Sequence, residues 1–249
     1  MVRTATIRGV PLLTVPVVVP GTWGGRPQPT LHADGIALRA WSVADAPAVR
    51  AAYDDPAIRR WHARSMADDA EAAAWIETRR AGWTAERLAE WAIVMTPMTP
   101  TTPTTPTIAG RGPGPGEVGL ERDGRADPAG QGVGGAAGLV VGRAGLNRVD
   151  LHEGIGTLAY WVVPAARRRG VAVLAAGEVL RWAFDDLGLH RVEVAHSTLN
   201  LASCRVAERL GCRAEGVRRS EALHADGHHD MHVHARLATD PAPPPLDPH

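Results

Sequence analysis

Residues 160–172 combine an apolar strand, an arginine-rich turn and the start of a helix. The strand character ends at Pro164, and Gly170 stands where the helix would begin. The first N–H groups of a helix have no partner within it and lie at its positive dipole end, so such a turn can bind a pyrophosphate. Gly170 and Ala172 would let a phosphate approach the backbone, and the arginines at 167–169 could add charge-assisted hydrogen bonds. The alternative is a solvated, arginine-rich turn before an ordinary helix.

Asn200 and Ser203 stand where a later strand gives way to a helix. Both side chains can hydrogen-bond a ligand, and a serine hydroxyl can also pass on a proton. The same residue types are preferred N-caps of helices in any protein, so a purely capping role is the alternative.

Several histidines cluster near the C-terminal end of the sequence, namely His224, His228, His229, His232 and His234. Asp230, His232 and His234 share strand parity, so their side chains would project from one face, and a zinc site is one hypothesis. The alternative is a hairpin whose histidines face solvent. We favour that alternative and expect no metal.

The pattern of apolar residues predicts a mixed sheet flanked by helices. The expected strands lie at 35–41, 91–95, 137–146, 155–163, 191–196, 212–223 and 229–237. The expected helices lie at 42–53, from 65 through 79 with a continuation around 85–90, at 171–187 and at 203–210.

Low-complexity segments divide the chain. Residues 96–135 are mostly Thr, Pro and Gly and hold too few large apolar groups for a core, which predicts a disordered insertion. We expect an N-terminal extension at 1–30, a single domain at 31–240 that contains the insertion, and a disordered tail at 241–249.

Length and charge bound the kind of protein. The 249 residues, 45% of them hydrophobic, suffice for one large globular domain. Because 27 basic and 27 acidic residues cancel, no overall field draws the chain to nucleic acid or an anionic membrane, and we expect neither partner. Pro11 and Pro16 interrupt the apolar stretch at 10–19, and no other run approaches the about 20 apolar residues that span a bilayer. Two cysteines, Cys204 and Cys212, are too few for a disulfide framework, so we expect a cytoplasmic protein.

The pattern Arg167-x-x-Gly170-x-Ala172 resembles the acetyl-CoA pyrophosphate motif of the GNAT acetyltransferase superfamily. Residues 160–164 resemble the strand that leads into that motif. Further similarities follow the family order: Leu38-Arg39 with Asp45, Asp55-Pro56 with Trp61, residues 184–193, Asn200-x-x-Ser203-x-x-Val206-x-Glu208-x-x-Gly211, and Asp226-Gly227-x-x-Asp230. They resemble the branch of ribosomal-protein N-terminal (alanine) acetyltransferases, over about 31–95 and 137–240.

The resemblance implies an α/β protein of α+β type with the GNAT fold. Its mixed, mostly antiparallel central sheet is flanked by helices and splayed at the acetyl-CoA site, where the pantetheine arm pairs with an exposed strand. The residues that the resemblance assigns to acetyl-CoA are Trp161, Val162, Val163, Arg167, Arg168, Arg169, Gly170, Val171, Ala172, Asn200 and Ser203. Asn200 would hydrogen-bond the pantetheine arm, and Ser203 would protonate the departing thiolate. A thioester is already activated, so no metal or redox cofactor is implied.

The general base is where the chain departs from the family. Relatives often carry a glutamate three residues before the Tyr-Trp pair and another after the phosphate turn, whereas this chain has Thr157 and Leu174. Glu153 is our candidate base, with His152 beside it, and either could act through water. The alternative is that both are solvated loop residues.

The expected function is acetyl-CoA-dependent N-acetyl transfer to a primary amine, either a protein N-terminus or a small molecule, by direct attack on the thioester. A catalytically silent acyl-CoA-binding module, acting as a sensor or assembly element, is the alternative. The expected partners are acetyl-CoA and the amine acceptor, and a homodimer is compatible with this interpretation.

Overall fold

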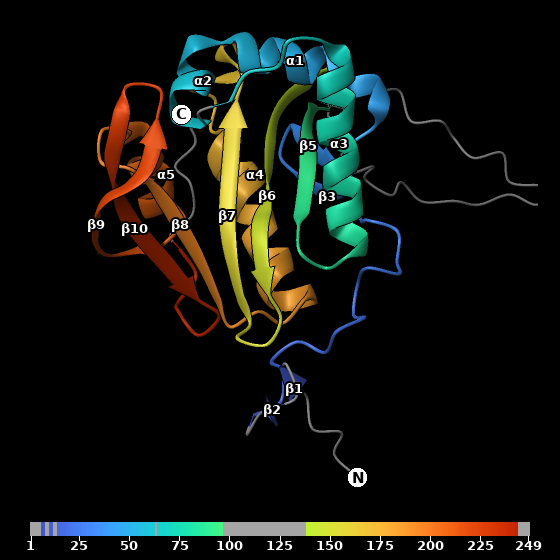
Figure 1. Cartoon of the computed structure of the whole chain (residues 1–249), viewed down its shortest axis with the longest axis vertical. Coiled ribbons are helices and arrows are strands. Elements are labelled where there is room, and N and C mark those ends of the chain that lie inside the picture. The colour runs from blue at the N-terminus through green and yellow to red at the C-terminus, as the bar shows by residue number, and fades with distance from the viewer. Residues whose placement is uncertain (1–5, 8–9, 12–13, 63, 97–137, 244–249) are drawn as a thin grey trace, which may run out of the picture. The chain divides into compact units, whose positions relative to one another are not determined.

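The computed structural model describes residues 6–7, 10–11, 14–62, 64–96 and 138–243. Its main feature is an eight-stranded sheet in the order β3-β4-β5-β6-β7-β8-β10-β9 (Figure 1). The strands are β3 (Leu31–Ala33), β4 (Ile36–Arg39), β5 (Ala89–Met95), β6 (Val140–Asp150), β7 (Ile155–Val162), β8 (Arg191–Ser197), β9 (Arg213–His224) and β10 (Gly227–Leu237). The expected α/β fold with a mostly antiparallel sheet is confirmed.

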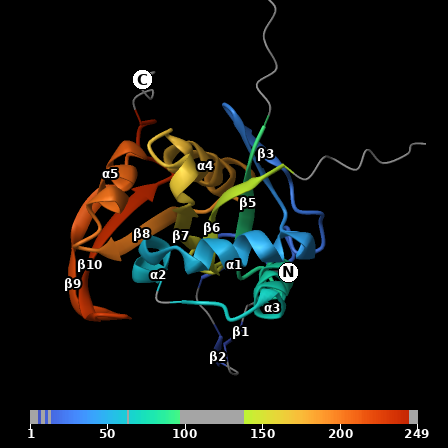
Figure 2. The ribbon, with the colours of Figure 1, turned by 90° about the horizontal axis from the view of Figure 1, so that it is seen from above.

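Helices cover both faces of this sheet. They are α1 (Ala46–Asp54), α2 (Pro56–His62), α3 (Asp69–Thr84), α4 (Val171–Arg181) and α5 (Leu201–Arg209). Figure 2 shows α4 and α5 on one side of the sheet, with α1 and α3 on the other. A separate short pair, β1 (Thr6–Ile7) and β2 (Val10–Pro11), lies near the N-terminus. No helix in the described ranges is long and apolar enough to cross a membrane.

The sheet opens between β7 and β8, its one parallel pair among the described strands. Pairing holds only from Ile155–Thr157 against Arg191–Glu193. Beyond this point β7 keeps β6 as its partner, while β8 keeps β10. No described strand therefore pairs with the second edge of β7 in its carboxyl half, as the resemblance predicts.

Helix starts follow local capping chemistry. Ser42 and Asp45 form a capping box, and Asp45 also receives two hydrogen bonds of 2.7 Å from Arg39. The expected helix at 42–53 is present as a 3-10 turn, Val43–Asp45, followed by α1. For α3, the capping oxygen belongs to Asp68, which accepts from the Glu71 N–H at 2.9 Å.

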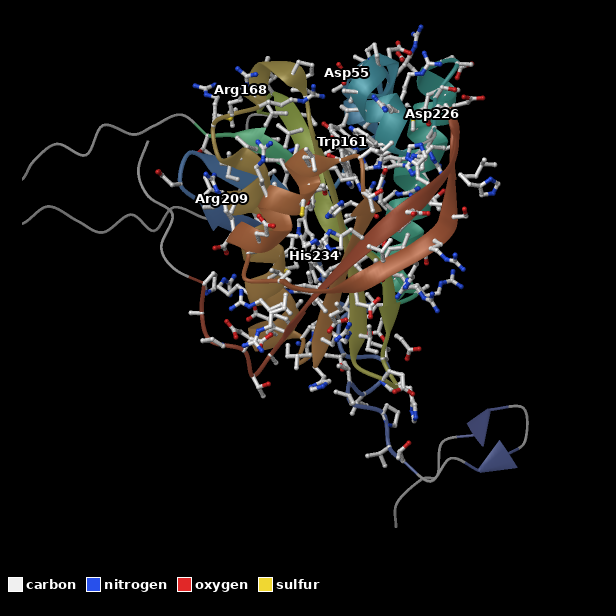
Figure 3. All side chains as sticks on the ribbon, turned by 90° about the vertical axis from the view of Figure 1, so that its left-hand side faces the viewer. Asp55, Trp161, Arg168, Arg209, Asp226 and His234 are labelled. Atoms are coloured by element: carbon white, nitrogen blue, oxygen red, sulfur yellow. The ribbon has the colours of Figure 1, made fainter. Side chains whose placement is uncertain are left out.

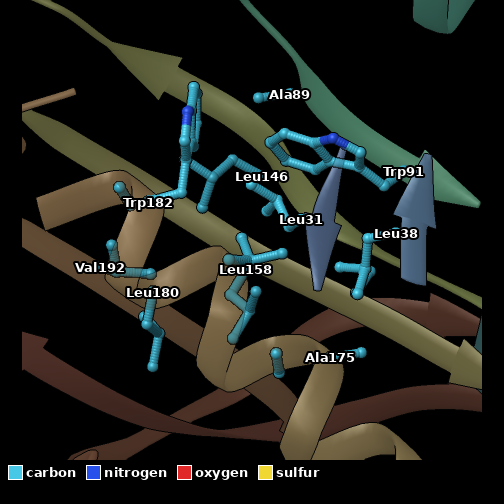
Figure 4. Close-up of a cluster of buried hydrophobic side chains, with 14 of the residues drawn as sticks. Leu31, Leu38, Ala89, Trp91, Leu146, Leu158, Ala175, Leu180, Trp182 and Val192 are labelled. Atoms are coloured by element: carbon cyan, nitrogen blue, oxygen red, sulfur yellow. The ribbon is translucent and has the colours of Figure 1, made fainter. Parts of the chain in front are cut away.

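Two apolar clusters hold the helices to the sheet. The α4 side, shown in Figure 4, is centred on the fully buried Trp91, whose ring centroid lies 5.0 Å from that of Trp182. The second cluster packs Trp41, Tyr53, Trp75 and Trp161 in edge-on or tilted contacts. Trp161, a predicted coenzyme residue, is thus fixed by the core.

Some expected boundaries were wrong. The predicted helical continuation around 85–90 is absent, because α3 ends at Thr84, Glu86 has a φ of 55°, and β5 begins at Ala89. The Glu86 carboxylate instead accepts from the backbone N–H groups of Gly21, Trp23 and Gly24, which holds the N-terminal segment against the domain. The expected helix at 171–187 ends as α4 at Arg181 and continues as a π-helical turn, Trp182–Asp186.

The predicted insertion at 96–135 lies outside the described residues except for Thr96, and so does 244–249 of the predicted tail. Their expected disorder stays a prediction.

Candidate functional site

The open edge of β7 presents backbone groups. The Val163 N–H donates to Val141 O on β6 at 2.9 Å, so the alternate residues Val162 and Tyr160 direct their N–H and C=O groups away from β6, toward the opening. Arg167 Nε donates to Val162 O at 2.9 Å. This edge offers the strand-like partner that a pantetheine arm requires.

The glycine turn continues directly from this strand. Gly170 is the N-cap of α4 with a φ of 73°, a conformation that favours glycine, and no side chain caps the helix. Among the described residues, a Cβ placed on Gly170 would meet nothing nearer than a Leu174 methyl at 4.0 Å, so they leave the space above the turn open. The N–H groups at the start of α4, which include those of Val171 and Ala172, therefore form an accessible anion site.

The three arginines of the turn divide into two kinds. Arg167 is half-buried and pairs with Asp55 at 2.8 Å, which ties the junction of α1 and α2 to the end of β7. Arg168 and Arg169 are exposed and form no salt bridge with any described residue. In Figure 3, Asp55, Trp161 and Arg168 lie near the same end of the sheet. The side chains of Arg168 and Arg169 are therefore free to contact an anion at the turn. The side chain of Arg167 instead links the end of β7 to the junction of α1 and α2.

One open pocket of about 310 Å³ gathers many of the predicted coenzyme residues. The predicted residues in its wall are Trp161, Val162, Arg167, Ala172, Asn200 and Ser203. Tyr160 completes the wall where β7 faces α5. The sequence motifs at 160–172 and 200–203 are thus brought to one place, although about 30 residues separate them along the chain.

Asn200 and Ser203 have different roles in the structure. The Asn200 side chain is the N-cap of α5 and accepts from the Ser203 N–H at 3.1 Å. Ser203 Oγ lies 2.7 Å from Tyr160 Oη and does not cap the helix. Burial raises the pKa of Tyr160 to about 12, so its hydroxyl keeps its proton at neutral pH. Tyr160 and Ser203 therefore form a pair that can donate a proton into the pocket.

A second pocket adjoins the first at Tyr160, Asn200 and Ser203. Its further lining comes mainly from the two strands at the opening, with Thr157 on β7 and His196 on β8, and includes His224 of β9, while His62 of α2 lines both pockets. Burial, followed by the charge of Arg143, lowers the pKa of His62 to about 3, so this imidazole is neutral at pH 7. Ser203 stands between the two pockets, where a group held in one can meet a group held in the other.

The predicted base is not part of this arrangement. Glu153 is exposed in the turn between β6 and β7, and its N–H donates to Asp150 Oδ1 at 3.1 Å. Tyr160 lies five residues, or roughly 16 Å at the usual rise per residue, from Ile155 at the start of β7, and Glu153 lies beyond Ile155 in the turn. Neither pocket has an Asp or Glu among its described lining residues. His152 lies in the same turn and contacts Thr14 at 3.1 Å.

The hairpin histidines differ from the expected solvent-facing row. His224, His229 and His234 are buried. His224 and His229 stack with ring centroids 4.2 Å apart, and both contact Trp61 of α2 edge-on. The alternating pattern did not reveal this, because α2 and α5 cover the hairpin from other parts of the chain.

Sequence reasoning gave no role to His62, and it placed Tyr160 in the strand that leads into the phosphate turn, with Tyr160 as the proton donor if Ser203 proved dispensable. The Asp55-Pro56 motif with Trp61 was the available signal, because it places α2 beside the pocket.

Comparison with known proteins gives the class of this fold and site. A family model described as an acetyltransferase (GNAT) domain matches residues 36–213. The chain therefore belongs to the GNAT acetyltransferase family, a family of acyltransferase enzymes.

Individual relatives point to one branch of that family. Over 101 residues the chain is 29% identical to YdaF of Bacillus subtilis (strain 168), whose name assigns it provisionally to the ribosomal N-acetyltransferases. That match covers 40% of this chain and 55% of YdaF, so the chain spans about half the length of this relative.

Solved structures share the fold at low sequence identity. The ribosomal-protein-S5-alanine acetyltransferase of Vibrio fischeri matches with a TM-score of 0.64 and 11% identity, over 85% of this chain and 98% of that one. RimL, a ribosomal L7/L12 α-N-protein acetyltransferase solved with coenzyme A, matches with a TM-score of 0.63 and 12% identity, over 84% and 98% of the two chains.

Proposed function

We propose that the protein is an acetyl-CoA-dependent N-acetyltransferase that moves an acetyl group to a primary amine. One observation carries this proposal: the pocket that begins beside the uncapped turn of α4 runs along the open edge of β7 to the Tyr160–Ser203 pair. Phosphates at the turn, a pantetheine arm along the edge and a thioester at Ser203 would follow that path in order.

The coenzyme contacts divide by chemistry. Backbone N–H groups of Gly170, Val171 and Ala172, with the side chains of Arg168 and Arg169, bind the pyrophosphate. Backbone groups at 161–163 and the Asn200 amide, whose oxygen already caps α5, hold the pantetheine arm. Arg167 stays on Asp55 and supports the end of β7.

The transfer balances without any further reagent. A neutral amine attacks the acetyl carbonyl, a C–N bond forms, the C–S bond breaks, and the amine gives up one proton. The thiolate takes a proton from Ser203 Oγ, which recovers one from Tyr160 Oη at 2.7 Å. Because the pKa of Tyr160 is raised to about 12, the tyrosine can supply that proton at neutral pH and is recharged by water. The proton of the amine leaves through water in the open pocket, because neither pocket has an Asp or Glu among its described lining residues.

The acceptor that we propose is a protein N-terminus. The second pocket meets the first at Ser203, and half-buried Trp61 and His62 of α2 line both pockets at this junction. A short extended peptide end suits such an opening between two diverging strands. The relatives named as ribosomal or ribosomal-protein acetyltransferases, one of them an α-N-protein acetyltransferase, support this choice of acceptor over a free small amine.

An amine panel tests the proposal. The purified chain is incubated with acetyl-CoA and with peptides that begin in alanine or serine, the same peptides with blocked N-termini, and free small amines. Thiol release and peptide mass are recorded. We expect one thiol and one acetyl group per free N-terminus and no reaction of the blocked peptides. Binding of acetyl-CoA with no transfer to any amine would instead indicate a silent acyl-CoA-binding module.

A further inference from the structure

A second cluster of reactive side chains lies beside the proposed catalytic pair. His196 of β8, His232 and His234 of β10, and Cys204 of α5 each offer one ligand atom, and these atoms all lie within 4.8 Å of one another. His196 and His234 are buried, while Cys204 and His232 are half-buried. Figure 3 labels His234, which lies in the interior below Trp161.

The sheet register brings the histidines together. His232 pairs directly with His196 across the antiparallel strands β10 and β8, and His234 follows two residues later on the same face. The helix α5 covers this face and places Cys204 Sγ 3.7 Å from His232 Nδ1 and 3.7 Å from His234 Nε2. Three separate elements therefore deliver one sulfur and three imidazoles to a single point.

The histidine rings are oriented as ligands. His196 Nδ1 is 2.9 Å from Ser197 O, and His234 Nδ1 is 3.4 Å from Cys212 O, so each ring uses Nδ1 on a backbone carbonyl. Their Nε2 atoms are left for the cluster, and His196 Nε2 is buried with no hydrogen-bond partner among the described residues. A carbonyl that holds the outer ring nitrogen is the usual support of a metal-binding histidine.

The spacing fits a tetrahedral ion. Zinc lies near 2.3 Å from sulfur and 2.0–2.1 Å from nitrogen, which in a tetrahedron separates a sulfur from a nitrogen by about 3.6 Å. Both sulfur–nitrogen distances of 3.7 Å agree with that edge. The limit of 4.8 Å means that some of the remaining pairs must close by rotation of a ring.

We propose that His196, Cys204, His232 and His234 bind one Zn²⁺ ion in a four-coordinate site that holds α5 on the sheet. Three imidazoles and a thiolate are a donor set that suits Zn²⁺ and excludes Mg²⁺ and Ca²⁺, which prefer oxygen. With four protein ligands, the site has no open position for a substrate. Because Ser203 precedes Cys204 in α5, the ion would fix the helix that carries Ser203. This departs from the expectation of no metal, which considered Asp230, His232 and His234 as one set and did not combine the hairpin histidines with Cys204 or His196.

Cobalt reports this site directly. The full chain, prepared without a histidine tag, is stripped with a chelator and titrated with Co²⁺, which takes the place of Zn²⁺. We expect one Co²⁺ per chain, intense visible bands of four-coordinate cobalt and a thiolate-to-cobalt band in the near ultraviolet. One equivalent of Zn²⁺ should remove both signals, and saturating Zn²⁺ should raise the melting temperature.

Matched variants separate the site from adventitious binding. Cys204→Ala should remove the thiolate band and weaken Zn²⁺ binding at least about 100-fold, since loss of a ligand costs more than loss of its supporting hydrogen bond. His228→Ala, an exposed histidine of the same hairpin, and Cys212→Ala, the other free cysteine, should keep the band.

Folding of each variant is checked by circular dichroism and by size-exclusion chromatography, neither of which requires the metal signal or the binding of acetyl-CoA. A wild-type chain that gives no thiolate band, or that binds Zn²⁺ no more tightly than a folded Cys204→Ala chain, would overturn the proposal. In that case the cluster is only a hydrogen-bonded group in which the Cys204 thiol donates to Glu208, at 3.5 Å, or to a histidine. Transfer to amines does not enter this test, so its outcome is independent of the proposed function.

Discussion

The hydroxyl groups of Tyr160 and Ser203 are 2.7 Å apart where β7 faces α5. If Ser203 protonates the thiolate, Ser203→Ala should lower kcat by about 10- to 1,000-fold with little change in acetyl-CoA affinity. Tyr160→Phe, which leaves the serine in place, should lower kcat less, by about 10-fold. Steady-state kinetics with a peptide acceptor measures both.

Ser65→Ala, at an exposed serine distant in sequence from Ser203, is the control and should change neither kcat nor the affinity for acetyl-CoA. Because Asn200 already caps α5, Ser203→Ala should cost little stability. A fully active Ser203→Ala enzyme would remove the serine from the mechanism.

His62 is expected to make the stability of the folded protein depend on pH in the acidic range. Its pKa falls from 6.5 unfolded to about 3 folded, mainly because it is buried, so below pH 6.5 the unfolded chain binds more protons. The neutral form thus contributes stability above pH 6.5, and this contribution is lost as the pH falls toward 3, at up to about 1.4 kcal/mol per pH unit.

The free energy of unfolding in urea, measured between pH 6.5 and pH 3, should therefore fall less steeply in His62→Asn than in the wild type. His228→Asn, at an exposed histidine, should keep the wild-type slope. Equal slopes for all three chains would show that the pKa of His62 is not lowered in the folded protein.

Sequence reasoning reached some residues of the site better than others. The roles of Gly170, Asn200 and Ser203 follow from motifs in which each residue lies at a fixed offset from a strand end or a helix start, so local pattern was enough to group them. The side chain of Arg167 could not be assigned to Asp55, because 112 residues separate them and only the fold brings them together.

At the scale of elements, the junction of α1 and α2 is joined to the end of β7 through Asp55 and Arg167. Asp55 also accepts from the Ile58 N–H at 3.0 Å. Asp55→Asn keeps an acceptor for that N–H but removes the charge pair, so we expect a loss of about 1 kcal/mol in stability and a higher KM for acetyl-CoA.

Asp54→Asn, at the exposed neighbouring residue, is the control and should leave the stability and the KM for acetyl-CoA unchanged. Thermal melting and initial rates at varied acetyl-CoA concentration measure the two effects. If Asp55→Asn changed neither the melting temperature nor the KM for acetyl-CoA, the Asp55–Arg167 pair would not support the turn before α4.

Helix and strand types were predicted better than their ends. The π-helical turn that replaces the last part of the expected helix at 171–187 is 5 residues long, too short for the spacing of its apolar residues to distinguish it from an α-helix. The absent continuation at 85–90 had good helix formers, yet Glu86 leaves the helical conformation to bind three backbone N–H groups of residues 21–24. Tertiary contacts overrode local preference there.

At the scale of the whole molecule, β5 and β6 are antiparallel neighbours that could be joined by a short turn. A Cβ on Gly138 would lie 3.1 Å from Met95 O, so the two ends that flank 97–137 are close together. Replacing 99–132 with a short Gly-Ser linker should therefore leave the melting temperature and acetyl-CoA affinity within error of the wild type. A broad or much lower melting transition would show that the segment contributes to the domain.

The sheet order also explains which groupings the sequence could not supply. The histidines of β10 were visible as a row, but their partners are on β8 and α5, and the register that pairs His232 with His196 is a property of the assembled sheet. The opening between β7 and β8 was expected only by resemblance, since no local pattern marks the residue at which two parallel strands part.

The central claim is that acetyl-CoA binds at the turn before α4, and isothermal titration of acetyl-CoA into two matched variants tests it most directly. Gly170 and Gly188 both have a φ above 70° and open space beside them, at opposite ends of the same helical segment, so a glutamate at either position causes comparable backbone strain. Gly170→Glu should lower affinity at least about 100-fold, because it places bulk and negative charge beside the pyrophosphate, while Gly188→Glu should bind like the wild type. Equal affinity of the two variants, each shown to be folded, would contradict the account.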